Sequence, residues 1–542
     1  MYDYVITNGW IVNGKNEKPF YGTLAVKKGI IAEISADGSL REECPEERIT
    51  DAGGGFVAPG FLDIHRHGDW EALRGGDDEL LLRQGITTVV NGNCGLSVAP
   101  SGDTHQKEIE DFLSSVTGRG SGVNRREAMV SMGGYMKCLS ETDRYVNTGM
   151  LAGNGTIRAG ICGYGAGPLT KEELRRVWTA LEESLEAGVL GVSLGIAYAP
   201  EFAYTLEELV QVLEPLRGTG IPIVTHVRNE GDGLLESLDE VIRVAGKLSV
   251  PLHVSHLKCI GKKNWGETAE KVLRRFDRAQ QQGVQVDFDL YPYLTGSTQL
   301  VHVLPPECQE GGTEMILRRL SDRDYCRHLT EVLKTPSREF ENIVELAGFE
   351  NIYASTMHTK RFLPYVGQSV AAIAKKLGMD EYDTLYQILK EEKCQVTMLD
   401  TIISQEDMLL FLKDKRANLI SDAIYPEGGK YHPRVYAAFP RFLVDYVRER
   451  QVFSIEEAIY KMTGKPAQVL GIDRGILEEG KAADICVFHL ENLKVAADFQ
   501  NPDRLCEGMA YVFVGGEKVL DHDRLQNVKC GRTLIRRFGK KK

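Results

Sequence analysis

The segment Phe61-Leu62-Asp63-Ile64-His65-Arg66-His67 is an apolar strand that runs directly into two histidines. In an extended chain, residues i and i+2 point the same way, so His65 and His67 face one side and Arg66 faces the other. Two imidazoles at the end of one strand are able to chelate a single cation. The same pattern, an apolar run followed by a residue with metal-binding chemistry, recurs along the chain.

Eight apolar runs of this kind alternate with helical stretches over the central part of the chain. Several of the intervening helices are expected to start at capping boxes, with Thr or Ser at positions 170, 205, 404 and 454 and an acidic residue three positions later. Such runs are typical of parallel strands covered by helices, and eight of them predict an α/β fold of the (β/α)8 TIM-barrel type. A doubly wound open sheet is the structural alternative. The expected strands are residues 56–64, 86–91, 148–153, 189–194, 221–225, 251–255, 284–290 and 417–421.

Residues able to bind a metal follow five of these strands. Each has an inert interpretation by itself, such as a buried thiol or a helix N-cap. In a barrel, however, the carboxyl ends of all strands meet at one mouth, and imidazole, thiolate and carboxylate groups are zinc ligands. His253 lies three residues before His256, so it faces the opposite side of its strand and is expected to be structural. The predicted metal site consists of His65, His67, Cys94, His226, His256 and Asp422.

Short strand-like segments separated by turns occupy both ends of the chain. Neither end alone has enough strands to bury a face, so the two ends are expected to pair. The predicted domains are a small β-sandwich formed by residues 1–55 and 465–542, and a metal-dependent barrel formed by residues 56–464. The seventh and eighth strands are much further apart than one helix requires, which predicts an inserted subdomain at about residues 295–350. Insertions after barrel strands lie on the catalytic face, where this one would act as a lid or as an interface.

Composition and charge narrow the class of protein. The 542 residues are 42% hydrophobic and 26% charged, and the net charge of −12 excludes an overall basic footprint for nucleic acid; the basic run at residues 536–542 is interpreted as a solvated terminus. No apolar run approaches the ~18–20 residues of a transmembrane helix, and the N-terminus enters a strand-like pattern without the basic start of a signal peptide. The 11 cysteines contain no Cys-x-x-Cys pair and are expected to be free thiols. We therefore expect a cytoplasmic protein with no membrane or nucleic-acid partner, and the oligomeric state is left open.

The motifs around these residues resemble those of the N-acyl-D-amino-acid deacylase (D-aminoacylase) family of the amidohydrolase superfamily. The resemblance spans nearly the whole chain. Cys94 after the second strand separates this family from members that carry a carboxylated lysine or a glutamate on the fourth strand, which here ends Gly-Val-Ser-Leu-Gly at residues 191–195. The matching segments are residues 57–67 (VAPGFLDIHRH), 85–95 (GITTVVNGNCG), 225–231 (THVRNEG), 255–258 (SHLK), 291–293 (YPY), 296–298 (GST), 421–422 (SD) and 432–434 (HPR).

This resemblance implies a zinc-dependent hydrolase whose substrates are N-acyl-D-amino acids. One zinc ion suffices for activity in the family, and a second is bound more weakly. The tight site would be formed by Cys94, His226 and His256, and the weaker one by His65, His67 and Asp422 with Cys94 shared.

The resemblance also implies roles in catalysis and substrate binding. Asp422 would take a proton from the attacking water and deliver it to the leaving nitrogen. Tyr198, in the segment Gly-Ile-Ala-Tyr at residues 195–198, would help to polarise the scissile carbonyl. The positions that receive the α-carboxylate of the substrate match Lys258, Tyr291, Ser297 and Arg434.

Some positions depart from the family pattern without removing a ligand. Arg66 and Gly68 stand where many members carry a small residue and an aspartate, Asn154 stands where a histidine is common, and Ala423 replaces the usual glycine. Members that prefer acidic D-amino acids are expected to place a basic residue in the insert. No Lys or Arg occurs at residues 296–317, which instead contain several aliphatic side chains, and this favours substrates with neutral or apolar side chains.

Two other functions remain open on the sequence. The first is a cyclic amidase of the dihydroorotase or hydantoinase type, although such enzymes usually need the carboxylated lysine. The second is a non-catalytic, assembly-forming relative that keeps the barrel, which the presence of all the ligand-type residues disfavours.

Overall fold

A closed parallel barrel forms the centre of the computed structural model, which describes residues 1–36, 40, 43–75 and 78–537. Its eight strands pair in chain order. The last strand meets the first through a parallel bridge between Arg66 and Ala423, and the backbone N–H of Asp422 donates to the carbonyl of His65 at 3.0 Å. The predicted TIM barrel is therefore confirmed. The barrel strands are β6 (Phe61–Asp63), β7 (Ile86–Asn91), β8 (Asn147–Gly153), β9 (Gly191–Gly195), β10 (Ile223–His226), β11 (Leu252–Val254), β12 (Val286–Leu290) and β17 (Ala417–Leu419).

The first expected strand, residues 56–64, is two strands that belong to different sheets. β5 (Phe56–Pro59) joins the sheet of the chain termini, and only β6 lies in the barrel. The chain passes from one sheet to the other at Gly60, where a side-chain carbon would lie 2.2 Å from Thr87 Oγ1. A continuous apolar run does not reveal this transition, because both segments are buried.

Amphipathic helices cover the outside of the barrel. In α10, for example, the buried residues Ala269, Val272, Phe276 and Ala279 recur at helical spacing. The expected capping boxes are complete at Thr170, Thr205 and Ser454, whereas Ser404 only accepts from the N–H of Asp407. Among the described residues, no helix is both long and apolar enough to cross a membrane, and residues 538–542 of the basic tail lie outside the description. The helices outside the insert are α1 (Asp69–Arg74), α2 (Asp78–Leu82), α3 (Gln106–Thr117), α4 (Arg125–Val130), α5 (Met132–Glu141), α6 (Asn154–Cys162), α7 (Lys171–Glu186), α8 (Leu206–Val212), α9 (Leu234–Leu248), α10 (Glu267–Gln281), α17 (Gln405–Lys413), α18 (Arg434–Arg441), α19 (Ile455–Met462) and α20 (Gly464–Leu470).

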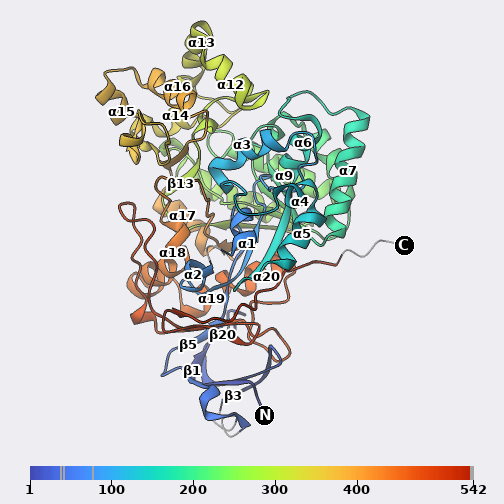
Figure 1. Ribbon diagram of the computed structural model, residues 1–542, viewed down its shortest axis with the longest axis vertical. Coiled ribbons are helices and arrows are strands. Elements are labelled where there is room, and N and C mark those ends of the chain that lie inside the picture. Colours follow the sequence, from blue (N-terminus) through green and yellow to red (C-terminus); the bar gives the residue numbers. More distant parts are fainter. Residues whose placement is uncertain (37–39, 41–42, 76–77, 538–542) are drawn as a thin grey trace.

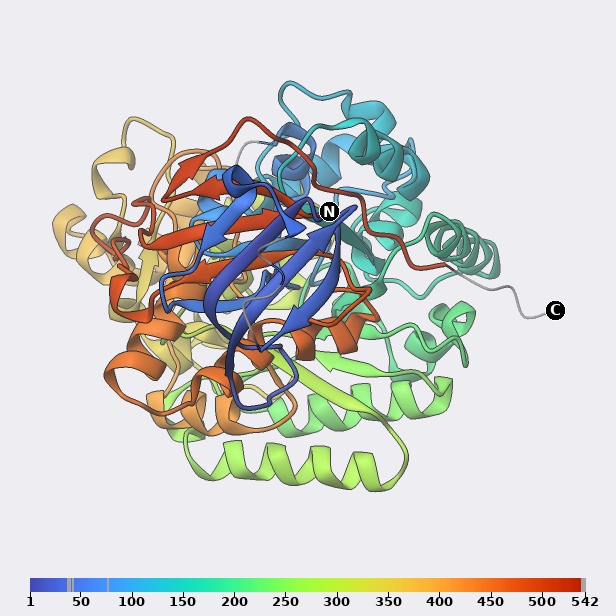
Figure 2. The ribbon, with the colours of Figure 1, turned by 90° about the horizontal axis from the view of Figure 1, so that it is seen from below.

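Strands from both chain termini form one nine-stranded sheet below the barrel, as Figure 2 shows by the contact of its blue and red strands. β18 from the C-terminal part pairs with β5 from the N-terminal part. The sheet curls over its own apolar face, because the rings of Tyr4 and Phe513 lie 5.5 Å apart although three strand pairings separate their strands. Its remaining strands are β1 (Tyr4–Ile11), β2 (Phe20–Lys27), β3 (Ile30–Ser35), β4 (Ile49–Asp51), β18 (Ile485–Phe488), β19 (Met509–Val514), β20 (Glu517–Asp521) and β21 (Arg524–Leu525).

An insert after β12 lies at the opposite end of the barrel from this sheet (Figure 1). It has its own four-stranded antiparallel sheet and its own apolar core. The sheet continues past residue 350, where the sequence placed the end of the insert, because β13 pairs with β16 about a hundred residues later. The strands are β13 (Thr295–Gln299), β14 (Ile352–Ala354), β15 (Gln368–Ser369) and β16 (Thr397–Thr401), and the helices are α11 (Pro306–Gln309), α12 (Gly312–Leu320), α13 (Arg323–Leu333), α14 (Ile343–Ala347), α15 (Val370–Leu377) and α16 (Glu381–Glu391).

Candidate metal centre

The side chains of all six residues predicted to bind metal meet at the carboxyl ends of the barrel strands. They follow β6, β7, β11 and β17 or, in the case of His226, end β10. Cys94 is central: its Sγ lies 3.3 Å from His65 Nε2 and 3.4 Å from His256 Nε2. The other separations are 3.0 Å between His226 Nδ1 and His256 Nε2, 3.4 Å between His65 Nε2 and Asp422 Oδ1, and 3.5 Å between His67 Nε2 and Asp422 Oδ1.

The four separations of 3.3–3.5 Å fit a shared cation, whereas the 3.0 Å between His226 Nδ1 and His256 Nε2 is shorter. Nitrogen and sulfur ligands bound tetrahedrally to zinc at ~2.0–2.3 Å lie roughly 3.3–3.5 Å from each other. Three overlapping groups of described residues have ligand atoms within 4.8 Å of one another. They are His65, Cys94 and His256; His65, His67 and Asp422; and His226, Glu230 and His256. His226 Nε2 and His67 Nδ1 are buried without a hydrogen-bond partner in the described part of the chain. A soft thiolate with several imidazoles is a donor set suited to zinc.

The backbone at three of these residues adopts the left-handed region that side chains disfavour. The φ angles are 54° at Cys94, 33° at His256 and 51° at Asp422. Non-glycine residues in this region cost of order 1–3 kcal/mol each and are concentrated at functional sites. The tight turns after β7, β11 and β17 therefore aim these side chains at one point at the expense of local stability.

Neighbouring positive charges favour the ionised forms of Cys94 and Asp422. Burial would raise the pKa of the Cys94 thiol, but His65 and His256 hold it well below its usual range. Burial likewise opposes ionisation of Asp422, yet Arg434, whose Nη2 lies 2.9 Å from Asp422 Oδ2, keeps the pKa of that carboxyl low. The thiolate and the carboxylate are thus available as ligands at neutral pH.

Asp289 on β12 accepts hydrogen bonds that orient two of the candidate metal ligands, His65 and His256. Its Oδ2 lies 3.3 Å from His65 Nδ1 and 2.8 Å from His253 Nε2, and its Oδ1 accepts the backbone N–H of His256. Burial would raise the pKa of Asp289, but His65 and His253 lower it below its usual range. The carboxylate thereby fixes the tautomer of His65 so that Nε2 faces the metal position. His253 is directed at Asp289 and away from the metal cluster.

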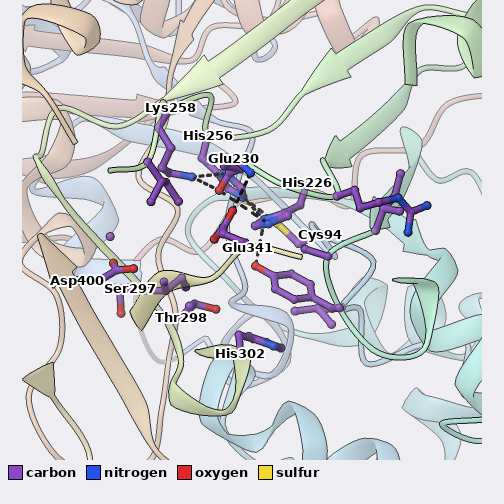
Figure 3. A pocket seen from close by; sticks show the side chains of 18 of the residues that line it. Cys94, His226, Glu230, His256, Lys258, Ser297, Thr298, His302, Glu341 and Asp400 are labelled. Carbon is purple, nitrogen blue, oxygen red and sulfur yellow. Dashed lines mark hydrogen bonds and ion pairs between the residues drawn. The ribbon is translucent and has the colours of Figure 1, made fainter. Parts of the chain in front are cut away.

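A cavity of about 120 Å³ opens beside the cluster and is lined by Tyr198, Lys258, Tyr291 and Ser297. Figure 3 shows Lys258 and Ser297 at this cavity. The hydroxyl of Tyr198 lies 3.0 Å from His226 Nδ1. Lys258 donates to Glu230 Oε2 at 2.7 Å, and this pairing outweighs the effect of burial and raises the pKa of Lys258.

The remaining predicted substrate contact, Arg434, begins α18 and is completely buried. Its guanidinium pairs with Asp422, donates to the carbonyl of Ser297 and stacks 4.5 Å from the ring centroid of Tyr291. Two of its nitrogens, Nε and Nη1, have no partner among the described residues.

Glu230, Asp289 and His302 were not identified from the sequence, although all three contact the site. Glu230 lies 3.1 Å from His256 Nδ1 and bonds Lys258, and although burial opposes ionisation these neighbours lower its pKa to about 2. His302 in the insert stacks on Tyr198 with ring centroids 4.2 Å apart, and neither of its ring nitrogens has a partner in the described chain. Glu230 and Asp289 occur in segments with the right motif or strand position, whereas no local pattern indicates His302.

Comparisons with known proteins agree with this geometry. Residues 417–520 match the model of the amidohydrolase family. A D-aminoacylase of Alcaligenes xylosoxydans xylosoxydans is 30% identical over 99% of this chain and 98% of the relative. The structure of an N-acyl-D-glutamate deacylase from Bordetella bronchiseptica, complexed with zinc and a phosphonate inhibitor, is 27% identical and covers 98% of this chain and 99% of its own, with a TM-score of 0.81. A D-aminoacylase structure concerned with a binuclear metal centre is 26% identical over 99% of this chain and 100% of its own, with a TM-score of 0.80. The chain therefore belongs to the D-aminoacylase family of amidohydrolases.

Proposed function

We propose that this protein is a zinc-dependent deacylase that hydrolyses the linear amide bond of N-acyl-D-amino acids to a carboxylate and a free D-amino acid. The observation that carries the proposal is the position of Cys94 Sγ between His65 and His256, at 3.3 and 3.4 Å. β9 provides neither a lysine nor a glutamate to hold two metals, so the Cys94 thiolate would serve in place of such a residue. This arrangement disfavours a cyclic amidase that depends on a carboxylated lysine.

Zinc fits the residues present. Cys94, His226 and His256 would hold the tightly bound ion, since His256 Nε2 lies 3.4 Å from Cys94 Sγ and 3.0 Å from His226 Nδ1. His65, His67 and Asp422 would form the second, weaker site with Cys94 shared. A zinc ion bound there lowers the pKa of a water ligand toward ~7 and polarises a carbonyl oxygen.

Asp422 and Tyr198 carry the proton and charge transfers in this proposal. Asp422 Oδ1 faces the metal cluster while Oδ2 is held by Arg434, so the carboxylate is fixed in orientation and ionised. It accepts a proton from the attacking water and delivers it to the leaving nitrogen. The Tyr198 hydroxyl, whose pKa burial raises well above its usual value, stays protonated and donates to the oxygen that develops negative charge.

The α-carboxylate of the substrate is received on the far side of the cavity. Lys258 supplies a positive charge, and the Ser297 hydroxyl, which is buried without a partner among the described residues, supplies a free donor. Tyr291 adds a phenolic hydroxyl at the same wall. Arg434 acts from beneath, because it is already engaged by Asp422 and by the Ser297 carbonyl.

The test is hydrolysis of paired N-acetyl-D- and N-acetyl-L-amino acids by the zinc-loaded protein, with Asp422→Asn as the variant. We expect hydrolysis of the D forms and a loss of about 10²–10⁴-fold in kcat for the variant, the range of general acid–base catalysis. Bound zinc, measured by elemental analysis, serves as the control for a retained tight site. Full activity of Asp422→Asn, or ring opening of a hydantoin without any deacylation, would contradict the proposal. A protein that neither contains nor takes up zinc would instead indicate a non-catalytic relative.

A further inference from the structure

Besides the exposed Glu339, two carboxylates that line the cavity have no role in the proposed reaction. Glu341 precedes α14, and Asp400 lies on β16, so both come from the insert and not from the barrel. Figure 3 shows both side chains at the cavity, together with Ser297 and Thr298. Glu341 accepts the backbone N–H of Glu230 with Oε2 at 2.8 Å, which leaves its other oxygen for a ligand.

Asp400 is the more deeply buried of the two. Asp400 is only 2% exposed, and its Oδ1 has no hydrogen-bond partner among the described residues. Leaving a buried charged oxygen unpaired costs several kcal/mol in general. An acceptor held in this way at a ligand cavity indicates that the ligand itself supplies the donor.

The position of Asp400 links it to the D-residue's side chain. A carbon built at Gly296 would lie 2.4 Å from Asp400 Oδ1 and 3.4 Å from the Tyr291 hydroxyl, so the carboxylate is beside the wall assigned to the α-carboxylate. The side chain of an amino acid leaves from the carbon that bears the α-carboxylate, whereas the acyl group extends toward the metal. With the α-carboxylate at that wall, Asp400 lies within reach of the substrate's side chain.

The two basic side chains that line the cavity among the described residues each have a carboxylate partner. Lys258 is paired with Glu230 at 2.7 Å. Arg228 is held in a fork by Glu240, at 3.0 and 2.9 Å, and its other donors reach backbone carbonyls. No lysine or arginine other than these two lines the cavity among the described residues. Lys258 is assigned to the α-carboxylate and Arg228 is held by Glu240, so neither is left for an acidic side chain of the substrate.

The surface just outside the cavity is also rich in acidic side chains. A wider depression of about 890 Å³ shares Phe202, Pro306, Glu339 and Phe340 with the cavity. Its lining also includes Glu307, Glu310 and Glu331, together with His328 and Arg338, and the latter is paired with Glu236 at 3.1 Å. Clefts lined by one sign of charge raise the local concentration of the oppositely charged ligand.

We propose that this deacylase acts on N-acyl-D-amino acids whose side chain ends in a cationic hydrogen-bond donor, a guanidinium or an ammonium group, held by Glu341 and Asp400. The inference rests on the proposed function, and it specifies the substrate class of that same site. It departs from the expectation of an apolar preference, which rested on residues 296–317 and therefore did not include positions 341 and 400.

The electrostatics of the empty cavity agree with this assignment. Burial, and next the charge of Glu230, raise the pKa of Glu341 to about 8, and burial raises that of Asp400 to about 6. Both carboxyls are thus poorly compensated without a ligand. A guanidinium or ammonium group between them offsets this cost, whereas the side-chain carboxylate of D-glutamate increases it.

The experiment compares kcat/KM for N-acetyl-D-arginine, its neutral isostere N-acetyl-D-citrulline, N-acetyl-D-leucine and N-acetyl-D-glutamate on the zinc-loaded protein. We expect D-arginine to exceed D-citrulline by about tenfold or more, the factor associated with charge-assisted hydrogen bonds. Glu341→Gln and Asp400→Asn should each reduce this ratio severalfold. Glu350→Gln makes the same change in charge on the insert, at an exposed residue outside the cavity lining, and should leave the ratio unchanged.

The outcomes separate this inference from the function on which it rests. Hydrolysis of D-leucine or D-glutamate in preference to D-arginine, or an arginine-to-citrulline ratio that neither variant lowers, would overturn the side-chain assignment alone. Failure of the zinc-loaded protein to hydrolyse any of the four N-acetyl-D-amino acids would overturn the deacylase function and the inference together.

Discussion

Replacing Asp289 by asparagine should weaken zinc binding without unfolding the barrel. Asp289 accepts from His65 Nδ1, His253 Nε2 and the backbone N–H of His256, so one carboxylate orients residues of both metal positions. An asparagine in its place keeps one acceptor oxygen. Its amide N–H₂ then faces either both imidazoles, which share Oδ2, or the backbone N–H of His256, which reaches Oδ1. At least one charge-assisted hydrogen bond is lost, and the remaining ones become neutral.

The expected magnitude follows from these contacts. Losing partners of metal-bound histidines typically lowers metal affinity by about 10–100-fold, which is about 1.4–2.7 kcal/mol. A hydrogen bond to a charged group contributes about 1.5–3 kcal/mol, so the two estimates agree. The loss should be seen first at the weaker position, where His65 belongs, and then at the tight position through His256.

The assay is competition for zinc with a chelator of known affinity, with circular dichroism as the check on folding. Asp287→Asn is the matched control, because Asp287 lies two residues earlier on the same strand and is paired with Lys465 away from the metal cluster. It should lower stability and leave zinc affinity unchanged. Zinc binding by Asp289→Asn within twofold of the parent would refute the reasoning, and so would an equal loss in Asp287→Asn.

Three further perturbations probe the same framework. Gly195→Ala should weaken zinc binding and lower activity, since the new carbon would lie 2.1 Å from the carbonyl oxygen of Cys94 and overpacking costs about 1–3 kcal/mol. Gly167→Ala, with nothing within 4 Å, should be silent in both zinc-content and activity assays. Burial raises the pKa of Glu201 to about 7 in the folded state, whereas the unfolded value is near 4.3. Between these two pH values the folded protein keeps a proton on Glu201 that the unfolded chain has lost. The contribution of Glu201 to the free energy of unfolding therefore declines as pH rises through that window. The stability of Glu201→Gln relative to the parent, from urea unfolding, should therefore improve from about pH 5 to about pH 7.5, and a constant difference would count against the assignment. Chelation of zinc should abolish activity and lower Tm, with about 2.7 kcal/mol of stabilisation restored at a free zinc concentration 100 times Kd; a Tm unchanged by chelation and by added zinc would mean that the cluster holds no metal.

Local sequence was sufficient to predict the barrel and the positions of the candidate metal ligands. Each strand is a short apolar run, and each candidate ligand stands immediately at its carboxyl end, so the pattern is contained within a few consecutive residues. Barrel geometry then brings these ends together whatever the intervening helices are. For that reason the positions of His65, Cys94, His226 and Asp422 relative to the strands were predictable although they are distant in the chain.

Only the tertiary structure determines how the side chains of the candidate metal ligands are oriented and which residues surround them. The left-handed backbone at Cys94, His256 and Asp422 is stable only because packing enforces it, and no propensity indicates such a conformation. The transition between sheets at Gly60 depends on its contact with Thr87. The pairing of β13 with β16, which brings Asp400 to the cavity, joins strands about a hundred residues apart. Periodicity and spacing report only local interactions, so a carboxylate contributed by a distant insert strand becomes part of the site only when the chain is folded.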